Sequence, residues 1–132
     1  MVHTVLVVED EPNIVLSLQF ILKQAGFVVR VARDGEQALR AIAEYVPNLV
    51  LLDIMLPKQD GFAVCEAIRA NPACRAVKII MLSAKSREAD KERALALGAD
   101  EFVTKPFSTR VLGKMVKEIV AVPTSVLKAK QV

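Results

Sequence analysis

Five side chains that suit phosphate or metal chemistry each follow a short apolar run of the chain. The first apolar run is followed by Glu9 and Asp10. Later runs are followed by Asp53, Ser83 and Lys105. If these runs are parallel strands, their carboxyl ends meet at one edge of a sheet, which is where ligands bind in such folds. Three clustered carboxylates repel one another unless a cation or Lys105 offsets their charge. Stability alone gives no reason for the cluster, so we predict a functional site.

Phosphoryl transfer to a carboxylate is the chemistry that this set of groups supports. A Mg²⁺ site typically has a few carboxylate oxygens as ligands and water at the remaining coordination positions, rather than a closed protein cage. Mg²⁺ recruits phosphate, and a carboxylate can attack phosphorus to form an acyl phosphate. The ammonium of Lys105 and the hydroxyl of Ser83 would then each pair with a phosphoryl oxygen. Taken singly, each residue is explained equally well as a turn former or a helix cap.

Two further aspartates are better explained as helix caps than as site residues. Asp34 and Asp60 each precede a glycine and a segment with helical spacing. Gln37 stands three residues after Asp34, as it would in a capping box. We expect both carboxylates to begin helices.

A parallel sheet would bring the site residues together, and strand-like and helix-like segments alternate along the chain as such a sheet requires. Short apolar runs rich in β-branched residues predict five strands, at Thr4–Val8, Val28–Ala32, Asn48–Leu52, Val77–Leu82 and Glu101–Val103. Helical spacing follows each strand. Five repeats of strand and helix predict an α/β fold whose parallel sheet is covered on both faces.

The apolar positions predict four firm helices and one weakly anchored helix. The firm ones have anchors at Ile14, Leu18, Ile21 and Ala25; at Ala38, Leu39, Ile42 and Val46; at Phe62, Cys65 and Ile68; and at Leu112, Met115, Val116 and Ile119. The fourth helical segment, from about Arg87 to Leu97, has only Ala89, Ala94 and Leu97 as apolar anchors. A helix so weakly anchored costs little to shift.

Length and charge indicate one domain without a nucleic-acid surface. The 132 residues are 53% hydrophobic and 25% charged, which fits one folded domain, and we assign it to residues 1–122. Residues 123–132 are predicted to be a tail or the start of a linker. The formal charge of +3 includes Lys128 and Lys130 of that segment, and the other basic residues alternate with acids. We therefore expect no direct binding of nucleic acid.

The cysteines and the N-terminal segment indicate where in the cell the protein is expected. Cys65 and Cys74 lack a metal-ligand spacing and His3 is the only histidine, which excludes a zinc cluster. The apolar run at Val5–Val8 is too short for a signal peptide or a membrane span. We expect a cytoplasmic protein with free thiols and no membrane contact.

Five motifs give the chain a family resemblance. They are Val-Val-Glu-Asp-Glu-Pro at 7–12, Leu-Leu-Asp-Ile-Met-Leu-Pro at 51–57, Met-Leu-Ser-Ala at 81–84, Gly-Ala-Asp at 98–100 and Lys-Pro-Phe at 105–107. With them the chain resembles the receiver domain of two-component response regulators, of the chemotaxis-regulator kind, over residues 4–122. The resemblance implies a flavodoxin-like, doubly wound (βα)5 fold with strand order 2-1-3-4-5.

The resemblance also implies roles for the site residues. Asp53 would accept a phosphoryl group from a histidine kinase or a phosphotransfer protein. Asp10 would bind Mg²⁺ directly, Glu9 would act nearby through water, and the backbone carbonyl of Met55 would be a further metal ligand. Lys105 would clamp the phosphoryl group and would precede a cis proline, which X-Pro chemistry permits.

Other positions would carry the response to phosphorylation. Ser83 would be the hydroxyl switch and Phe102 the second, aromatic switch, although an aromatic on a buried strand is explained equally well as core. Met55 and Lys85 would tune the lifetime of the phosphoryl group. The output surface would be the face made by the fourth helix, the fifth strand and the fifth helix, and it would control a partner or an output domain.

Three alternatives compete with this interpretation. A phosphatase of the haloacid-dehalogenase type needs a second aspartate two residues after the nucleophile, and that position is Met55. A nucleotide-binding or flavin-binding fold needs a glycine-rich loop after the first strand, where the chain has Glu9 to Pro12. A degenerate receiver that binds partners without being phosphorylated stays open. We therefore expect a signalling phosphoacceptor rather than an enzyme.

Overall fold

The chain folds as a parallel sheet between two layers of helices. The structure is a computed structural model that describes residues 3–85 and 87–121. The elements are β1 (Thr4–Val8), α1 (Pro12–Gln24), β2 (Val28–Ala32), α2 (Gly35–Glu44), β3 (Leu49–Asp53), α3 (Gly61–Ala70), the short 3-10 helix η1 (Pro72–Cys74), β4 (Lys78–Ser83), α4 (Glu88–Ala96), β5 (Glu101–Thr104) and α5 (Thr109–Ala121).

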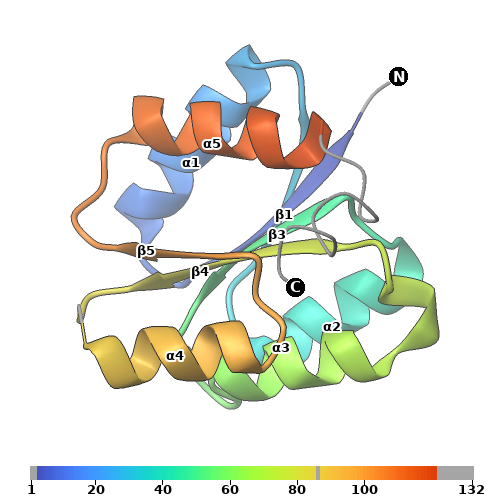
Figure 1. Ribbon diagram of the computed structural model, residues 1–132. Helices are drawn as coiled ribbons and strands as arrows, with labels where there is room; N and C mark the ends of the chain where they lie inside the picture. Colours follow the sequence, from blue (N-terminus) through green and yellow to red (C-terminus); the bar gives the residue numbers. More distant parts are fainter. Residues whose placement is uncertain (1–2, 86, 122–132) are drawn as a thin grey trace.

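The layers confirm the predicted flavodoxin-like fold. The five strands are parallel and lie in the order β2-β1-β3-β4-β5. Helices α1 and α5 cover one face, and α2, α3 and α4 cover the other (Figure 1). The reversal of strand order beside β1 creates a switch point between β1 and β3, so the carboxyl ends of these two strands are where a ligand site is expected.

Strands β3 and β4 begin and end one residue later than predicted, and β5 extends to Thr104. Asp53 pairs with Leu82 and Ser83 pairs with Thr104 in the ladder. Backbone pairing does not depend on side-chain polarity, so the polar residues that were expected to follow the strands are their last members. The sheet therefore fixes the backbone of the candidate site.

The sheet buries alternate residues of each central strand on opposite faces. Leu6 and Val50 pack in the core beneath α2, α3 and α4. Val7 and Leu51 pack in the core beneath α1 and α5. Strands β1, β3 and β4 are buried along their whole length, as expected for a parallel sheet that is covered twice.

Both predicted aspartate caps are confirmed. Asp34 Oδ1 accepts a hydrogen bond of 2.8 Å from the backbone N–H of Gln37, and Asp60 Oδ1 accepts one of 2.9 Å from that of Ala63. The Gln37 side chain accepts from the backbone N–H of Arg33, one residue before the cap. These aspartates begin α2 and α3 and are not part of the acidic cluster.

Two of the predicted helix anchors are wrong. Val46 lies beyond the end of α2 with 40% of its surface exposed. Ala25 and Leu97 are the C-caps of α1 and α4 and are partly buried. Ala89 is exposed, because α4 begins at Glu88 and five residues of helix place Ala89 about 140° around the axis from Ala94. Ala94 is the only buried residue of α4, so this helix is held even more weakly than predicted.

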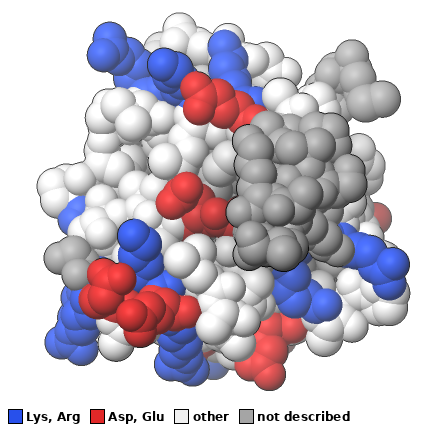
Figure 2. Space-filling model, in the orientation of Figure 1, with Lys and Arg blue, Asp and Glu red and all other residues white. Residues whose placement is uncertain are grey.

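The described surface carries mixed charge and no membrane span. Figure 2 shows Lys and Arg interspersed with Asp and Glu over the face formed by α4. No helix within residues 3–85 and 87–121 has the length and apolarity needed to traverse a bilayer. The segment 123–132, predicted to be a tail or linker, lies outside the described residues.

Candidate functional site

The predicted carboxylates converge at the carboxyl ends of β1 and β3. One carboxylate oxygen from each of Glu9, Asp10 and Asp53 lies within 4.8 Å of the others. Glu9 is fully buried and Asp53 is 4% exposed, whereas Asp10 is exposed. The cluster is thus closed on the side of the sheet and open to solvent at Asp10.

Lys105 supplies the positive charge that the cluster needs. It follows β5, and its Nζ lies 2.6 Å from Glu9 Oε1 and 3.2 Å from Asp53 Oδ2. The second oxygen of Glu9 accepts hydrogen bonds from the backbone N–H groups of Asp10 and Glu11, at 3.1 and 3.4 Å. Both oxygens of the buried Glu9 carboxylate are therefore paired. The bond between Lys105 and Pro106 is cis, as the family resemblance implies.

The pKa values of two site residues are raised. Burial is the largest reason that the pKa of Glu9 lies above its ordinary value of 4.5, and the neighbouring Asp53 carboxylate adds to it. Burial disfavours the ammonium form of Lys105, but its contacts with Glu9 and Asp53 outweigh this and raise the pKa of Lys105 above 10.5. Lys105 is therefore a fixed cation at neutral pH, and Glu9 is costly to keep ionised without additional positive charge.

The loop after β3 orients the Asp53 carboxylate. The backbone N–H of Met55 donates to Asp53 Oδ1 at 3.2 Å, and the Met55 side chain is 65% exposed. The N–H of Gly61 donates to the carbonyl of Ile54 at 2.9 Å. A Cβ atom at Gly61 would collide with the carbonyl oxygen of Asp53, so only glycine lets α3 begin this close to the site.

Ser83 lies at the end of β4, next to the site. It is 3% exposed, and its Oγ accepts a hydrogen bond of 3.0 Å from the backbone N–H of Lys85. Its carbonyl accepts from the N–H of Lys105 at 2.7 Å. Ser83 is thus joined to the start of the β4–α4 connection through its hydroxyl and to the backbone of Lys105 through its carbonyl.

Phe102 lies on the edge strand β5 and is partly buried. Its ring packs against the core beneath α2, α3 and α4. Met81 is its partner in the sheet and is fully buried. These contacts are compatible with a core role and with a switch role, and the prediction for Phe102 stays untested.

The acidic cluster fits a hard divalent cation. Three carboxylates face a single ammonium, so the cluster keeps an excess of negative charge. The available ligand atoms are oxygens, with one carboxylate open to solvent, which suits a Mg²⁺ ion that retains several waters. Soft ligands are absent from this cluster among the described residues.

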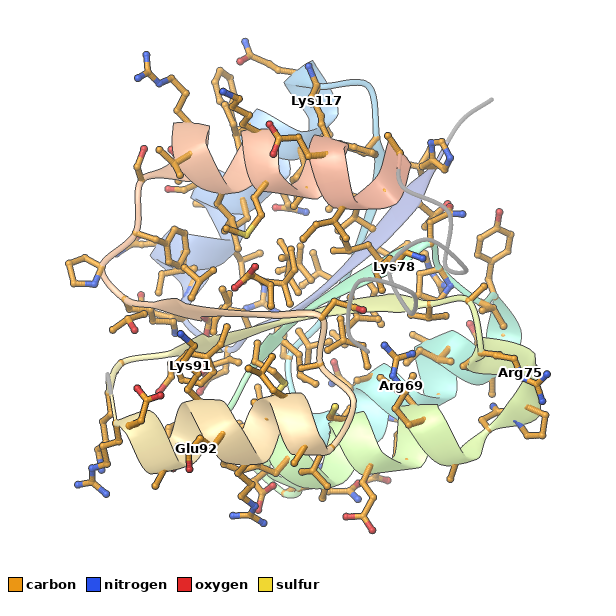
Figure 3. All side chains as sticks on the ribbon, viewed as in Figure 1. Arg69, Arg75, Lys78, Lys91, Glu92 and Lys117 are labelled. Carbon is orange, nitrogen blue, oxygen red and sulfur yellow. The ribbon has the colours of Figure 1, made fainter. Side chains whose placement is uncertain are left out.

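A groove adjoins Lys105 on the side of α1 and α5. It has a volume of about 540 Å³, and its lining includes Asn13, Ile14, Ala84, Lys105 and Phe107. Figure 3 shows the side chains that fill the space between α5 and the sheet. The groove gives a partner a way to reach the ammonium from the outside of the molecule.

Sequence reasoning missed Arg69, which holds the far end of α4. Its guanidinium reaches from α3 towards the sheet, whereas Arg75 points outward (Figure 3). It donates to the carbonyls of Gly98 and Val77 at 2.9 and 2.6 Å and to Asp100 Oδ2 at 3.1 Å. The same Asp100 oxygen accepts from the backbone N–H of Ile79 at 2.8 Å. The only signal in the sequence was an arginine next to the apolar anchors of α3.

A family model and a curated relative match this chain. The model described as "Response regulator receiver domain" matches residues 5–117. The alkaline phosphatase synthesis transcriptional regulatory protein PhoP of Bacillus subtilis (strain 168) is 44% identical over an alignment of 129 residues, and the match covers 94% of this chain and 53% of the relative. The chain therefore spans about half the length of this curated relative.

Solved structures agree with the family match. A putative response regulator from Chloroflexus aurantiacus J-10-fl is 34% identical, with a TM-score of 0.87 over 92% of this chain and 100% of that one. The chemotaxis response regulator CheY4 of Vibrio cholerae is 27% identical, with a TM-score of 0.85 over 90% of this chain and 99% of that one.

Proposed function

The chain belongs to the response regulator receiver domain family, and we propose that it takes a phosphoryl group from a histidine kinase or a phosphotransfer protein onto Asp53. A receiver is a signalling phosphoacceptor rather than an enzyme that turns over external substrates. One observation carries the proposal: the buried Asp53 carboxylate lies between two acidic groups and the Lys105 ammonium. We assign the receiver to residues 1–122 and propose that residues 123–132 are a tail or the start of a linker.

The proposed reaction transfers phosphorus from nitrogen to oxygen. A carboxylate oxygen of Asp53 forms a bond to phosphorus while the bond from phosphorus to the donor imidazole nitrogen breaks, and the electron pair of that bond leaves with the imidazole. Lys105, 3.2 Å from Asp53 Oδ2, would pair with one phosphoryl oxygen. The Met55 N–H, which donates to Asp53 Oδ1, holds the carboxylate in place for the attack.

The acidic cluster is the proposed site of Mg²⁺. Asp10, Asp53 and the carbonyl of Met55 would hold the ion directly, and Glu9 would act through water. Bound Mg²⁺ would neutralise charge on the phosphoryl oxygens. The excess of three carboxylates over one ammonium and the exposure of Asp10 support this assignment.

The response would begin at Ser83. We propose that its hydroxyl leaves the N–H of Lys85 and donates to the phosphoryl group, which draws the β4–α4 connection towards the site. Phe102 would move inward as the second switch. The weak anchoring of α4 supports this path, because its movement disrupts few buried contacts. Met55 and Lys85, both exposed beside the acceptor, would set the phosphoryl lifetime through their effect on water access.

The proposed partners meet different faces of the molecule. The donor kinase or phosphotransfer protein would dock on α1 and the β5–α5 loop, where the groove beside Lys105 opens. A downstream protein or an output domain would bind the face made by α4, β5 and α5. We propose a cytoplasmic location, because receivers work with kinases there, and we expect no direct contact with nucleic acid or membrane.

The test is intact mass after incubation with acetyl phosphate and Mg²⁺. We expect a phosphoryl adduct on the unmodified chain, none without Mg²⁺ and none on Asp53→Asn. Asp60→Asn is the matched control, because Asp60 is a helix cap outside the cluster, and it should be phosphorylated normally. The absence of an adduct on the unmodified chain would overturn the proposal in favour of a receiver that acts only by binding.

A further inference from the structure

A second groove lies between the end of α1 and the first nine residues of α5. It has a volume of about 300 Å³, and Ile21, Ala25 and Gly113 contribute its apolar part. A Cβ atom at Gly113 would lie 3.2 Å from Ile21 Cγ1, so the glycine lets the two helices approach closely. None of its lining residues lines the groove beside Lys105, and the inference below does not depend on phosphorylation of Asp53.

Basic side chains line the α5 side of this groove. Arg110, Lys114 and Lys117 stand four and three residues apart, which places them on one side of the helix. All three are exposed, and Glu118 is the only acidic residue of α5. Figure 3 shows Lys117 at the outer edge of α5, away from the sheet, and Figure 2 shows several Lys and Arg groups and one acidic group at that end of the molecule.

These cations have no acidic partners within residues 3–85 and 87–121. The ion pairs there join Arg30 to Glu44, Lys58 to Asp34 and Glu36, Arg69 to Asp100, and Lys105 to Glu9 and Asp53. The lining of the groove contains no carboxylate. An apolar floor with a rim of unneutralised cations is complementary to a ligand that carries both apolar and acidic groups.

We propose that this groove binds an acidic, partly apolar segment of a partner protein. Carboxylates of the segment would pair with Arg110, Lys114 and Lys117, and an apolar side chain would lie over Ile21 and Gly113. The chain's own residues 122–132 are disfavoured as occupant, because they include Lys128 and Lys130 and no acid. A second copy packed α5 against α5 is disfavoured too, since a two-fold contact sets the basic rim against itself.

Nucleic acid fits the groove less well than an acidic peptide does. Bases of single strands stack on aromatic side chains, and the lining contains none. A duplex would engage a wider basic surface, and on the face of α4 the basic residues are mixed with acids. The groove has the dimensions of a side-chain site rather than of a duplex.

The test uses a fluorescein-labelled dodecapeptide that alternates Glu with Leu, measured by fluorescence anisotropy. We expect the double variant Lys114→Glu, Lys117→Glu to lose binding at least tenfold, and Lys114→Gln, Lys117→Gln to lose less. Lys91→Glu on α4 is the matched control, exposed and without an ion pair among the described residues, and it should change affinity less than twofold. Thermal unfolding of each variant verifies that the fold is retained.

A map of the bound peptide completes the test. Amide shifts in labelled protein should concentrate at Ala25, Gly113 and Lys114 and leave Leu95 on α4 unchanged. The proposal is overturned if the peptide does not bind, if a peptide with Gln in place of Glu binds equally well, or if the double charge reversal has no effect. It is also overturned in favour of nucleic acid if a single-stranded dodecanucleotide binds more tightly and shifts the same amides.

Discussion

The two ends of α4 differ in what holds them. At the start of the helix, Arg87 occupies the N-cap position without a side-chain hydrogen bond to the helix, and the first six residues, Glu88 to Arg93, include no buried residue. After the last turn, Gly98 with φ 106° and Ala99 return hydrogen bonds of 3.1 and 3.0 Å to Leu95 and Ala94. These are the two bonds of a Schellman motif, and Arg69 adds its bond to the Gly98 carbonyl.

The difference between the two ends of α4 indicates how a change at the acidic cluster could reach this helix. The weakly held start of α4 follows Ser83, which comes directly after Leu82, the sheet partner of Asp53 in the acidic cluster. The firmly held end is tied to α3 and β4 through Arg69 and Asp100. A change at Ser83 would therefore move the start of the helix while the end acts as a pivot. A helix whose two ends differ in local stability is suited to such a movement.

Removal of Arg69 should have the largest effect, because it breaks the firm end. Arg69→Met leaves the Asp100 carboxylate, whose side chain is 14% exposed, without its cation. We expect a loss of about 3 kcal/mol in the free energy of unfolding, measured by urea denaturation. Arg75→Met is the control, since Arg75 is exposed, and should change it by less than about 0.5 kcal/mol. Equal effects of the two variants would contradict the assigned role of Arg69.

Gly98→Ala tests the backbone conformation that ends α4. Gly98 has φ 106°, and a Cβ atom there would lie 2.8 Å from Arg69 Cγ. Gly26 has φ 95° with nothing within 4 Å of such an atom, so Gly26→Ala isolates the conformational cost. We expect about 1 kcal/mol of destabilisation for Gly26→Ala from the left-handed conformation alone, and about 2 kcal/mol for Gly98→Ala, where the contact adds to it. A Gly98→Ala cost no larger than that of Gly26→Ala would show that the contact with Arg69 is unimportant.

Arg87→Asp should strengthen the weak end. Arg87 has the extended backbone of an N-cap residue, with φ −74° and ψ 129°, so an aspartate there can accept from the first free N–H groups of α4. We expect a gain of about 1 kcal/mol from the cap and the helix dipole, and slower hydrogen exchange at Asp90 and Lys91. Arg87→Gln, which lacks the charge and is a poorer cap, should give little change. Destabilisation by the aspartate would contradict the view that this end lacks a cap.

A change of pH should alter stability through Glu9 of the acidic cluster. The pKa of Glu9 is raised in the folded state, so from pH 4.5 upward the native chain binds more protons than the unfolded chain, and the free energy of unfolding falls as pH rises through that window. Glu9→Gln removes this contribution. We expect the stability of the unmodified chain, relative to that of Glu9→Gln and without Mg²⁺, to fall between pH 4.5 and 7, measured by urea denaturation at each pH. A rise in relative stability with pH would reverse the sign and contradict this role of Glu9.

The sequence predicted the fold because its signals are repeated and local. Short apolar runs recur five times, and helical spacing follows each of them. Asp34 and Asp60 mark helix starts by chemistry that acts within four residues. The errors fall where the local signal is weak. Ala89 looked like an anchor because α4 has few apolar residues to fix its phase, and Val46 continues the spacing of α2 after the helix has ended.

The convergence of the acidic cluster was also predictable, but the contacts within it were not. Parallel strands bring Glu9, Asp10 and Asp53 to one edge whatever their side chains do. The 2.6 Å contact of Lys105 with Glu9 depends on how a flexible side chain settles among three carboxylates. Arg69 was missed because its partners are mostly backbone carbonyls, and no sequence pattern marks a carbonyl as free to accept.

The measurement that tests the central claim most directly is a comparison of amide chemical shifts before and after acetyl phosphate and Mg²⁺ are added to labelled protein. The account predicts large changes from Ser83 through the start of α4 to Asp90, and small changes at Gly98, Ala99 and Asp100. The Asp53→Asn variant should show no phosphorylation-dependent change at either end of α4. Unchanged amides along residues 87–97 in protein that carries the phosphoryl group, or equal changes at both ends of α4, would contradict the account.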